Sequence, residues 1–272
     1  MVMRGPSLSE PMFRKFAELL SLRVGMFYDD HKREMFRLKI ARHMRRAKVY
    51  SCEAFYRLLL QEDSRELWAD FVDDMTVHTT RFFRERHHFN YLQSQFSEIC
   101  QANPRILERM ELRAWSAATS TGEEAYTLAM VLRETLGDAV AFRVLATDVS
   151  RGALLKALAG EYQEEIRKDV APLLIQRYFK PTPRGFSVGP ELRRSVVFRL
   201  FNLVDQFPFA RPLDVIFCRN VMIYFPAEAQ RILLQKLYHA LAPGGLLFVG
   251  HAESLANKEH RFRYTQPEIY MR

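Results

Sequence analysis

Four short polar segments in the second half of this sequence carry residue types that could bind a small charged molecule, and each follows a short apolar run. In the first, AATSTGEEAY, Gly122 and its small neighbours let the backbone approach a ligand at the start of a helix. The other three runs are followed by Asp148, by Asn202 and Leu203, and by Arg219 and Asn220. Ligands of open α/β sheets bind beyond the carboxyl ends of the strands. The four segments therefore predict one binding site at such an edge.

Asp148 allows two interpretations. Its carboxylate can accept hydrogen bonds from both ribose hydroxyls of an adenosine-type ligand. It can equally act as the N-cap of a helix that begins near Ser150. The polar residues at the other strand ends favour a nucleotide-type ligand, but spacing alone goes no further.

The apolar runs predict the sheet that positions these residues. We expect five parallel strands, at residues 112–117, 142–147, 196–201, 213–218 and 245–250. Helices are expected at 122–136, 150–158 and 226–241. Pro243, Gly244 and Gly245 are expected to end the last helix and turn the chain. The fold class is α/β, a doubly wound domain.

Two regions fall outside that alternation. From about residue 8 to residue 75 the apolar spacing predicts several short helices and no strand. Residues 161–195 form an insertion in which Gly185–Gly189 is expected to be a short edge strand or hairpin. We therefore expect an N-terminal helical domain at 1–76 and a larger domain at 77–272.

Positive charge is concentrated in residues 31–48, with eight basic residues and one acidic residue, Glu34. Phe36, Ile40, Met44 and Ala47 share one face of a helix there, so that face should pack inward. The basic face is either simply solvated or faces an acidic protein partner. Nucleic acid is not favoured, because no recognised nucleic-acid module accompanies the charge.

Composition limits the remaining classes of protein. The chain has 272 residues, of which 48% are hydrophobic, and a net charge of +8. Its three cysteines have neither disulfide nor zinc-motif spacing, and no apolar segment is long enough to span a membrane. We expect a soluble, cytoplasmic protein. His87 and His88 diverge on a helix and have no carboxylate at ligand spacing, so we expect no metal.

Several motifs resemble the CheR-type chemotaxis receptor methyltransferases. They are TTRFFRERHHF (79–89), WSAATSTGEEAY (115–126), ATDVS (146–150), FNLVD (201–205), IFCRNVMIYF (216–225) and LAPGGLLFVGHAES (241–254). The resemblance covers nearly the whole chain in order. It implies a Rossmann-like domain with an inserted antiparallel β subdomain, which transfers a methyl group from S-adenosylmethionine to receptor glutamates and yields S-adenosylhomocysteine.

The resemblance also implies roles for individual residues. Arg84 and Tyr224 would act at the methyl-transfer site. Cofactor contacts would come from His78, Thr80, Arg84, Glu124, Asp148, Asn202, Leu203, Arg219 and Asn220. The protein substrate would be the cytoplasmic helical region of a chemoreceptor, docked through helix 31–48 and the insertion at 161–195. The membrane would be reached only through that substrate.

Two positions depart from the family pattern. His78 stands where the family usually has asparagine, and Ala125 stands where it usually has proline. Two alternatives therefore stay open. One is a catalytically silent S-adenosylmethionine-binding regulatory module, and the other is a methyltransferase of this fold that acts on another protein.

Overall fold

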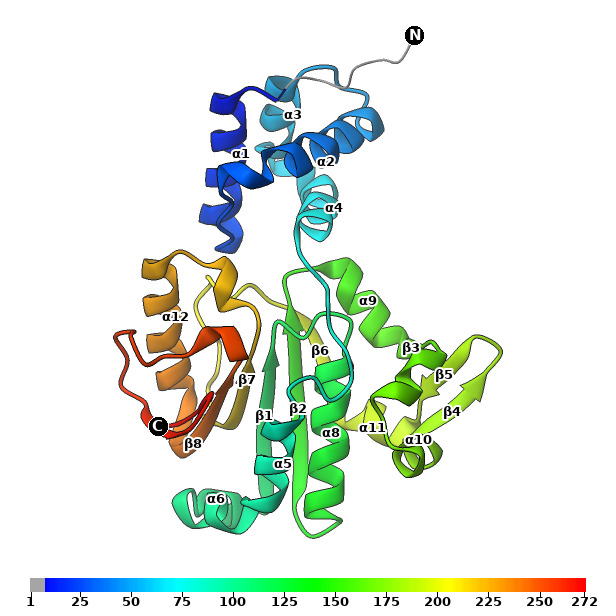
Figure 1. The fold of residues 1–272 in the computed structure, drawn as a ribbon, viewed down its shortest axis with the longest axis vertical. Helices are drawn as coiled ribbons and strands as arrows, with labels where there is room; N and C mark the ends of the chain where they lie inside the picture. Colours follow the sequence, from blue (N-terminus) through cyan, green and yellow to red (C-terminus); the bar gives the residue numbers. More distant parts are fainter. Residues whose placement is uncertain (1–7) are drawn as a thin grey trace. The chain divides into compact units, whose positions relative to one another are not determined.

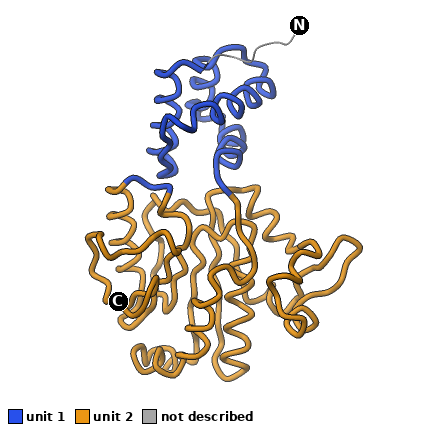
Figure 2. Tube along the Cα trace, viewed as in Figure 1, with its two compact units in different colours: residues 1–77, 224–226 blue, residues 78–223, 227–272 orange. Residues whose placement is uncertain are grey.

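A computed structural model describes residues 8–272 and divides the chain into two compact units (Figures 1 and 2). The first contains the residues up to Val77 together with Tyr224–Pro226. The second contains His78–Ile223 and Ala227–Arg272. None of the helices within residues 8–272 combines the length and the apolar character needed to cross a lipid bilayer.

The N-terminal unit is built from short helices, as the sequence predicts. They are α1 (Glu10–Val24), η1 (Asp30–Lys32), α2 (Arg33–Arg46), α3 (Cys52–Leu59), η2 (Glu62–Ser64) and α4 (Arg65–Met75). The Ser9 and Ser51 hydroxyls cap α1 and α3 by accepting hydrogen bonds from Met12 N and Ala54 N. Five phenylalanines bury their rings between the helices: Phe13, Phe16, Phe36, Phe55 and Phe71. These rings form the core of the unit.

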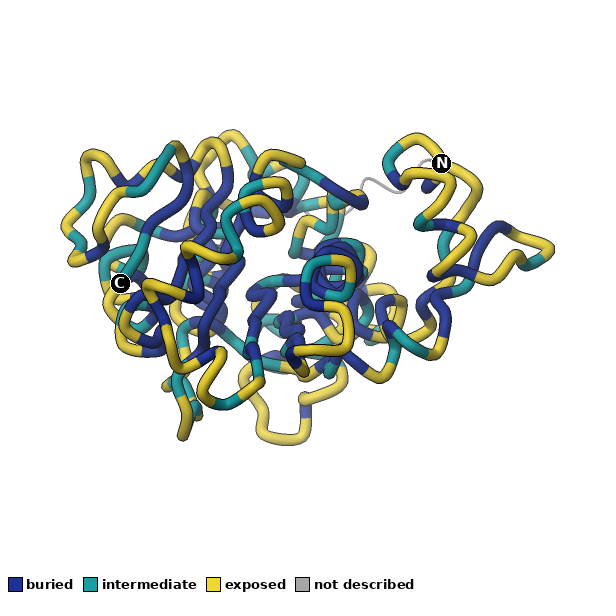
Figure 3. The backbone as a smooth tube through the Cα atoms, turned by 90° about the horizontal axis from the view of Figure 1, so that it is seen from below, coloured by how far each residue is buried: buried dark blue, intermediate teal, exposed yellow. Residues whose placement is uncertain are grey.

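The sheet of the C-terminal unit has seven strands in the order β6-β2-β1-β7-β8-β10-β9 (Figure 1). The five predicted strands are confirmed and parallel: β1 (Glu111–Ala117), β2 (Ala141–Asp148), β6 (Val196–Leu200), β7 (Leu213–Cys218) and β8 (Leu241–Val249). An antiparallel hairpin that the sequence pattern does not predict extends the sheet: β9 (Arg263–Gln266) and β10 (Ile269–Met271). Every residue of β7 is buried, and Figure 3 marks such segments in dark blue.

Helices connect and cover these strands. Three precede the sheet: α5 (Arg86–Ser94), α6 (Phe96–Ala102) and α7 (Arg105–Arg109). Three more lie between strands: α8 (Glu123–Leu136), α9 (Arg151–Ala159) and α12 (Ala227–Ala240). Short turns η4 (Met222–Tyr224) and η5 (His251–Glu253) follow β7 and β8. Because the strands are parallel, each connection carries the chain back to the amino edge of the sheet, and every central strand ends at the carboxyl edge.

The predicted turn at Pro243, Gly244 and Gly245 is wrong. Helix α12 ends at Ala240 and β8 begins at the next residue, so these three residues lie inside β8. They form an irregularity in the pairing with β7: Leu213 pairs with Leu241, but Val215, two residues later, pairs with Leu246. Gly244 has a φ of 75°, and a methyl group on its Cα would overlap the Ala102 carbonyl. The glycines therefore make room for α6 instead of reversing the chain.

The insertion forms a small antiparallel sheet of its own. It contains β3 (Glu161–Tyr162), η3 (Glu164–Lys168), α10 (Pro172–Tyr178), β4 (Phe179–Thr182), β5 (Gly185–Val188) and α11 (Pro190–Ser195). The hairpin of β4 and β5 is confirmed, but the expected edge position of β5 is wrong, because β3 pairs with its other side. Glu134 of α8 binds this subdomain, accepting a hydrogen bond from the Tyr178 hydroxyl and pairing with Arg177 at 2.8 Å.

Replacing Gly244 by alanine should destabilise the protein more than the same change at Gly137. Both glycines have positive φ, which costs alanine about 1–3 kcal/mol, but Gly137 has no atom within 4 Å of the added methyl group. Gly244→Ala must also displace the Ala102 backbone, so we expect an additional loss of about 2 kcal/mol in the free energy of unfolding. Urea unfolding of both variants measures the difference. Equal losses would show that β8 tolerates a side chain at this irregularity.

Candidate functional site

The carboxyl ends of β2, β1 and β7 lie side by side, because these strands are neighbours in the sheet. Ala117 at the end of β1 is in register with Thr147 on one side and Cys218 on the other. Asp148 ends β2, and Arg219 follows β7 directly. The structure therefore gathers polar segments from distant parts of the sequence at one edge, where ligands of such sheets bind.

Asp148 is held by backbone groups on both of its carboxylate oxygens. Oδ2 accepts a hydrogen bond from Ser120 N (2.8 Å), and Oδ1 accepts one from Ser150 N (2.9 Å). The N-cap interpretation is wrong, because Ser150 itself caps α9 by accepting from Ala153 N (3.0 Å). Burial raises the pKa of Asp148, against the opposing effect of these two hydrogen bonds and of His78. Each oxygen retains a lone pair for a ligand hydroxyl.

The loop after β1 has an unusual backbone. Ala118, Ser120 and Gly122 all have positive φ. An added methyl group on Gly122 would lie 2.8 Å from the Ala157 side chain, so glycine is needed here to pack against α9. The expected role of Gly122 in ligand approach stays a prediction. The buried Thr119 hydroxyl makes no hydrogen bond to any of the described residues. It is therefore available to bind a ligand.

Arg219 points into the protein, and its side chain is 1% exposed. Its Nε donates to Glu124 Oε2 (2.8 Å), and its Nη1 donates to the Arg84 carbonyl (2.8 Å). Nη1 also lies 3.3 Å from Glu85 Oε2. The predicted ligand contact of Arg219 would therefore have to come from its backbone, while its guanidinium fixes Glu124 and the segment before α5.

His88 completes the surroundings of Arg219. Its Nδ1 lies 2.9 Å from Arg219 Nη1, and it must act as the acceptor because a guanidinium has only donors. Burial and the nearby Arg219 charge lower the pKa of His88 to about 2, so its imidazole is neutral. The structural role predicted for this histidine is thus consistent with its contacts.

Glu124 lies at the first turn of α8 and is buried. Its Oε1 accepts a hydrogen bond from the Ser116 hydroxyl (2.7 Å), while Oε2 binds Arg219. The neighbouring Glu123 instead accepts from Thr121 Oγ1 (2.7 Å), and burial raises its pKa. Glu124 is therefore the carboxylate of this pair that is fixed between β1 and β7.

Glu253 is a residue of this site that the sequence analysis missed. Its side chain is buried in η5, where Oε2 accepts from Asn220 N (2.6 Å) and Gly250 N (2.8 Å). Oε1 accepts from Ile223 N (3.2 Å). Asn220 has a φ of 59°, so these hydrogen bonds stabilise a left-handed backbone conformation, which asparagine adopts more readily than most residues other than glycine. The signal in the sequence was an acidic residue in the HAES segment just after a predicted strand.

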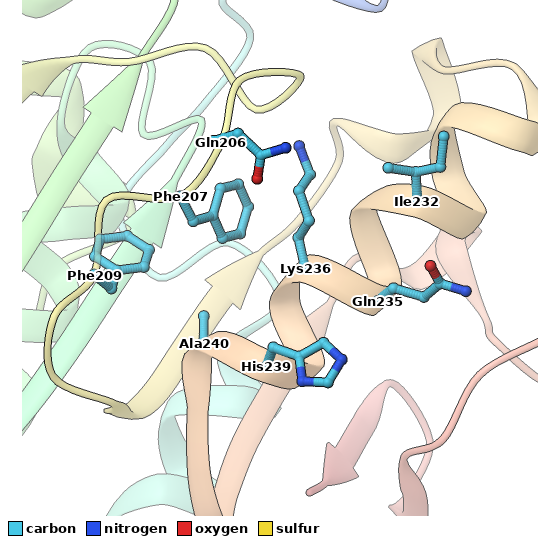
Figure 4. A pocket seen from close by; sticks show the side chains of 8 residues that line it. All are labelled: Gln206, Phe207, Phe209, Ile232, Gln235, Lys236, His239 and Ala240. Atoms are coloured by element: carbon cyan, nitrogen blue, oxygen red, sulfur yellow. The ribbon is translucent and has the colours of Figure 1, made fainter.

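Asn202 and Leu203 lie in a tight turn after β6. Asn202 Oδ1 accepts from Val204 N (3.3 Å), and Lys236 of α12 donates to the carbonyls of Leu203 (2.5 Å) and Asp205 (2.9 Å). An open pocket of about 420 Å³ lies between this loop and α12, with Lys236 beside the Phe207 ring (Figure 4). Lys236 therefore couples the turn to α12.

The remaining predicted residues are distributed over both units. The His78 carbonyl accepts from Ser120 Oγ (3.3 Å), which brings His78 next to the β1 loop. Thr80 and Arg84 are half-buried in the same segment, and Arg84 Nη1 donates to the Thr79 carbonyl (2.9 Å). Tyr224 groups with the N-terminal unit, where its carbonyl accepts from Phe27 N (2.7 Å). Its role in methyl transfer stays a prediction.

The fold and its polar edge define an S-adenosylmethionine-dependent methyltransferase domain, preceded by a helical domain. Residues 78–271 match the family described as CheR methyltransferase, SAM binding domain, and residues 11–76 match its all-alpha domain. The chain belongs to the CheR methyltransferase family. The two carboxylates and the unpartnered Thr119 hydroxyl fit a cofactor with a ribose diol and positively charged groups.

Curated relatives agree over nearly their full length. The chain is 37% identical over 270 residues to the chemotaxis protein methyltransferase of Escherichia coli K12, which covers 97% of this chain and 91% of the relative. It is 35% identical over 270 residues to the protein of the same name from Salmonella typhimurium, with the same coverage. Chemotaxis protein methyltransferase 2 of Pseudomonas aeruginosa is 34% identical over 264 residues, covering 95% of this chain and 91% of the relative.

Glu253→Gln should weaken cofactor binding. A carboxylate accepts hydrogen bonds on both oxygens, whereas the amide has one oxygen and an NH2 group that can only donate, so it cannot bind all three backbone N–H groups. Asn220 therefore loses support. Hydrogen bonds to a charged group contribute about 1.5–3 kcal/mol. We expect the Kd of S-adenosylhomocysteine to rise at least about tenfold by calorimetry. Glu228→Gln, at an exposed position of α12, is the control. An unchanged Kd in folded Glu253→Gln would exclude this positioning role.

Proposed function

We propose that this protein transfers the methyl group of S-adenosylmethionine to glutamate side chains of chemoreceptors. The products would be glutamate 5-O-methyl esters and S-adenosylhomocysteine. The observation that carries the proposal is the match of both parts of the chain to the CheR family. The names of the relatives, which place them in chemotaxis, support the choice of substrate.

The fixed carboxylates suggest how the cofactor would be held. Asp148 would accept hydrogen bonds from the ribose hydroxyls with the lone pairs that Ser120 and Ser150 leave over. Glu124 would face the methionine end, where its charge suits the cofactor's ammonium group. Further contacts would come from His78, Thr80, Asn202, Leu203, Asn220 and the backbone of Arg219.

The chemistry needs alignment more than proton transfer. A glutamate side chain has a reference pKa of about 4.3, so the nucleophile is already ionised at neutral pH and requires no general base. The carboxylate oxygen attacks the methyl carbon, and the electrons of the breaking bond return to sulfur. Water slows this union of an anion and a cation by stabilising both, so the site must exclude water while holding the groups in line.

Arg84 is proposed to position the substrate carboxylate. Its hydrogen bond to the Thr79 carbonyl holds the side chain, and its remaining donors stay available for a carboxylate. A tight ion pair would make the carboxylate a weaker nucleophile, so we assign Arg84 to steering and Tyr224 to orientation without a full charge.

Helix α2 is proposed to dock the receptor. Phe36, Ile40 and Met44 are buried as predicted, Ala47 is half-buried, and the opposite face exposes Arg42, Arg45 and Arg46. Two of these arginines pair with acidic residues of α4: Arg42 with Asp74, and Arg46 with Asp70 (3.4 Å). Both remain at least half-exposed, so the face keeps a positive field for a glutamate-rich helical region.

The insertion at 161–195 is proposed as a second docking element. Its small sheet is held to α8 through Glu134, so a partner bound to it would be fixed relative to the methyltransferase domain. We propose that the protein works in the cytoplasm, without nucleic acid, and meets the membrane only through its receptor.

Methyl transfer from labelled S-adenosylmethionine to cytoplasmic receptor fragments tests the reaction. We expect label that is released by mild base, because carboxylic esters are alkali-labile. Arg84→Ala and Tyr224→Phe should each lower the rate about tenfold or more, whereas Arg105→Ala, at an exposed position of α7, should not.

Three outcomes would contradict parts of this proposal. Cofactor binding with no transfer to any receptor fragment would favour the silent regulatory module. Label on another protein alone would favour a different substrate. Full rates with unchanged cofactor affinity in Arg84→Ala or Tyr224→Phe would remove these two residues from the transfer site.

Neutralising the basic face of α2 should slow methylation without affecting the cofactor. We expect Arg42→Gln, Arg45→Gln and Arg46→Gln together to lower the rate about three- to tenfold at low salt and to flatten its salt dependence. The fold should persist, since exposed ion pairs contribute only about 0–1 kcal/mol. Arg105, Arg231 and Arg261, changed together to glutamine, give a control with the same net charge. Equal effects in both triple variants would exclude a specific docking face.

A further inference from the structure

One carboxylate of the C-terminal unit is surrounded by three imidazoles. His87 Nε2 lies 2.9 Å from Glu268 Oε2, His88 Nε2 lies 3.2 Å from the same oxygen, and His251 Nδ1 lies 2.5 Å from Oε1. His87 and His88 come from α5, His251 from η5, and Glu268 from the turn between β9 and β10. The sequence showed no carboxylate partner for the paired histidines, because Glu268 lies 181 residues from His87.

Glu268 is buried and fixed by its backbone, whereas two of the histidines around it are exposed to solvent. The Glu268 side chain is only 8% exposed, and its backbone is fixed to the end of β8, where its carbonyl accepts from Val249 N (3.0 Å). The side chains of His87 and His251 are 51% and 85% exposed. A solvent-borne ion can therefore reach the group without any opening of the fold.

The hydrogen bonds decide which nitrogens can act as ligands. His88 Nδ1 accepts from Arg219, so in the neutral ring the proton sits on Nε2, which faces Glu268. His88 is therefore unable to coordinate through Nε2 in this tautomer, and that nitrogen lies 3.2 Å from Glu268 Oε2 without forming a hydrogen bond. His87 and His251 are not held in this way, and each can move its ring proton to the nitrogen that does not face Glu268.

We propose that His87 Nε2 and the Glu268 carboxylate bind a divalent transition-metal ion, with zinc the preferred physiological ion, and that the exposed His251 side chain turns inward to become the third protein ligand. Before that turn, the atoms that lie within 4.8 Å of one another are those of His87, His88 and Glu268. Two imidazoles and one carboxylate, completed by water, are a ligand set that zinc accepts in tetrahedral geometry. The ion binds these two ring nitrogens in the tautomers that leave them unprotonated.

The donor set also predicts selectivity. Imidazole nitrogen suits zinc, nickel and copper, whereas magnesium and calcium require oxygen ligands. With a single anionic ligand and a water-exposed face, we expect affinity in the micromolar range. The metal ligands include neither Asp148 nor Glu124, although His251 shares η5 with Glu253. Zinc titration therefore tests the metal site directly, without relying on the proposed methyl transfer.

Calorimetry on the full chain, after treatment with a chelator, tests the site with zinc chloride and with magnesium chloride. We expect one zinc ion per chain with a micromolar Kd and no heat of binding from magnesium. His87→Ala, His251→Ala and Glu268→Gln should each weaken zinc binding about tenfold or more, while His239→Ala, on the exposed surface of α12, should not. Cobalt, used as a spectroscopic probe, should give the intense visible absorption of a tetrahedral site.

His251→Ala is the decisive variant, because a side chain that is 85% exposed can be removed without unfolding the protein. Zinc binding that is unchanged in His251→Ala and His87→Ala would overturn the proposal. So would a stoichiometric loss in His239→Ala, or a cobalt spectrum of the weak octahedral type.

Discussion

The site depends on one buried ionic interaction, in which the Arg219 guanidinium lies between Glu124 and Glu85. Burying a cation without partners would destabilise the fold by several kcal/mol. Here the guanidinium is bound by two carboxylates, a carbonyl and an imidazole, which offset that cost. These partners come from α8 and from residues 84–88, which span the start of α5. Because Arg219 follows β7 directly, its contacts fix both of these pieces of chain against the carboxyl end of the sheet. The positions of Glu124 and Arg84 follow from that constraint.

Two further carboxylates act on the backbone in the same way. Asp148 joins the β1 loop to the start of α9 through Ser120 and Ser150, and Glu253 joins the turns after β7 and β8 through Asn220 and Gly250. Each satisfies N–H groups that the end of a strand leaves without a partner in the sheet. An added methyl group on Gly250 would lie 2.5 Å from Asn220 Nδ2, so only glycine permits the close approach of these two turns. The loops at this edge are thereby held before any ligand binds.

The sequence predicted what depends on local pattern and missed what depends on distant pairing. The strand at 213–218 was placed to the residue because apolar, β-branched residues fill a strand buried on both faces. The hairpin of β9 and β10 has only half-exposed and exposed residues in its first strand, so it carries no comparable signal. Pro243 and the two glycines were read as a turn, since nothing local reveals that Ala102 needs the space. Arg219 and Glu268 gained their roles from partners 95 to 181 residues away.

Distant pairing also separates the two adjacent glutamates, Glu123 and Glu124, as candidates for binding a charged cofactor. Both lie in the first turn of α8, where the helix dipole favours a negative charge, so sequence position does not separate them. Glu123 has only a hydroxyl for support, and burial raises its pKa. Glu124 is held by both a hydroxyl and a guanidinium. In the proposed reaction the nucleophile is already ionised, so the task of the site would be alignment, and of these two glutamates Glu124 is the one held firmly enough to fix the position of a bound cofactor.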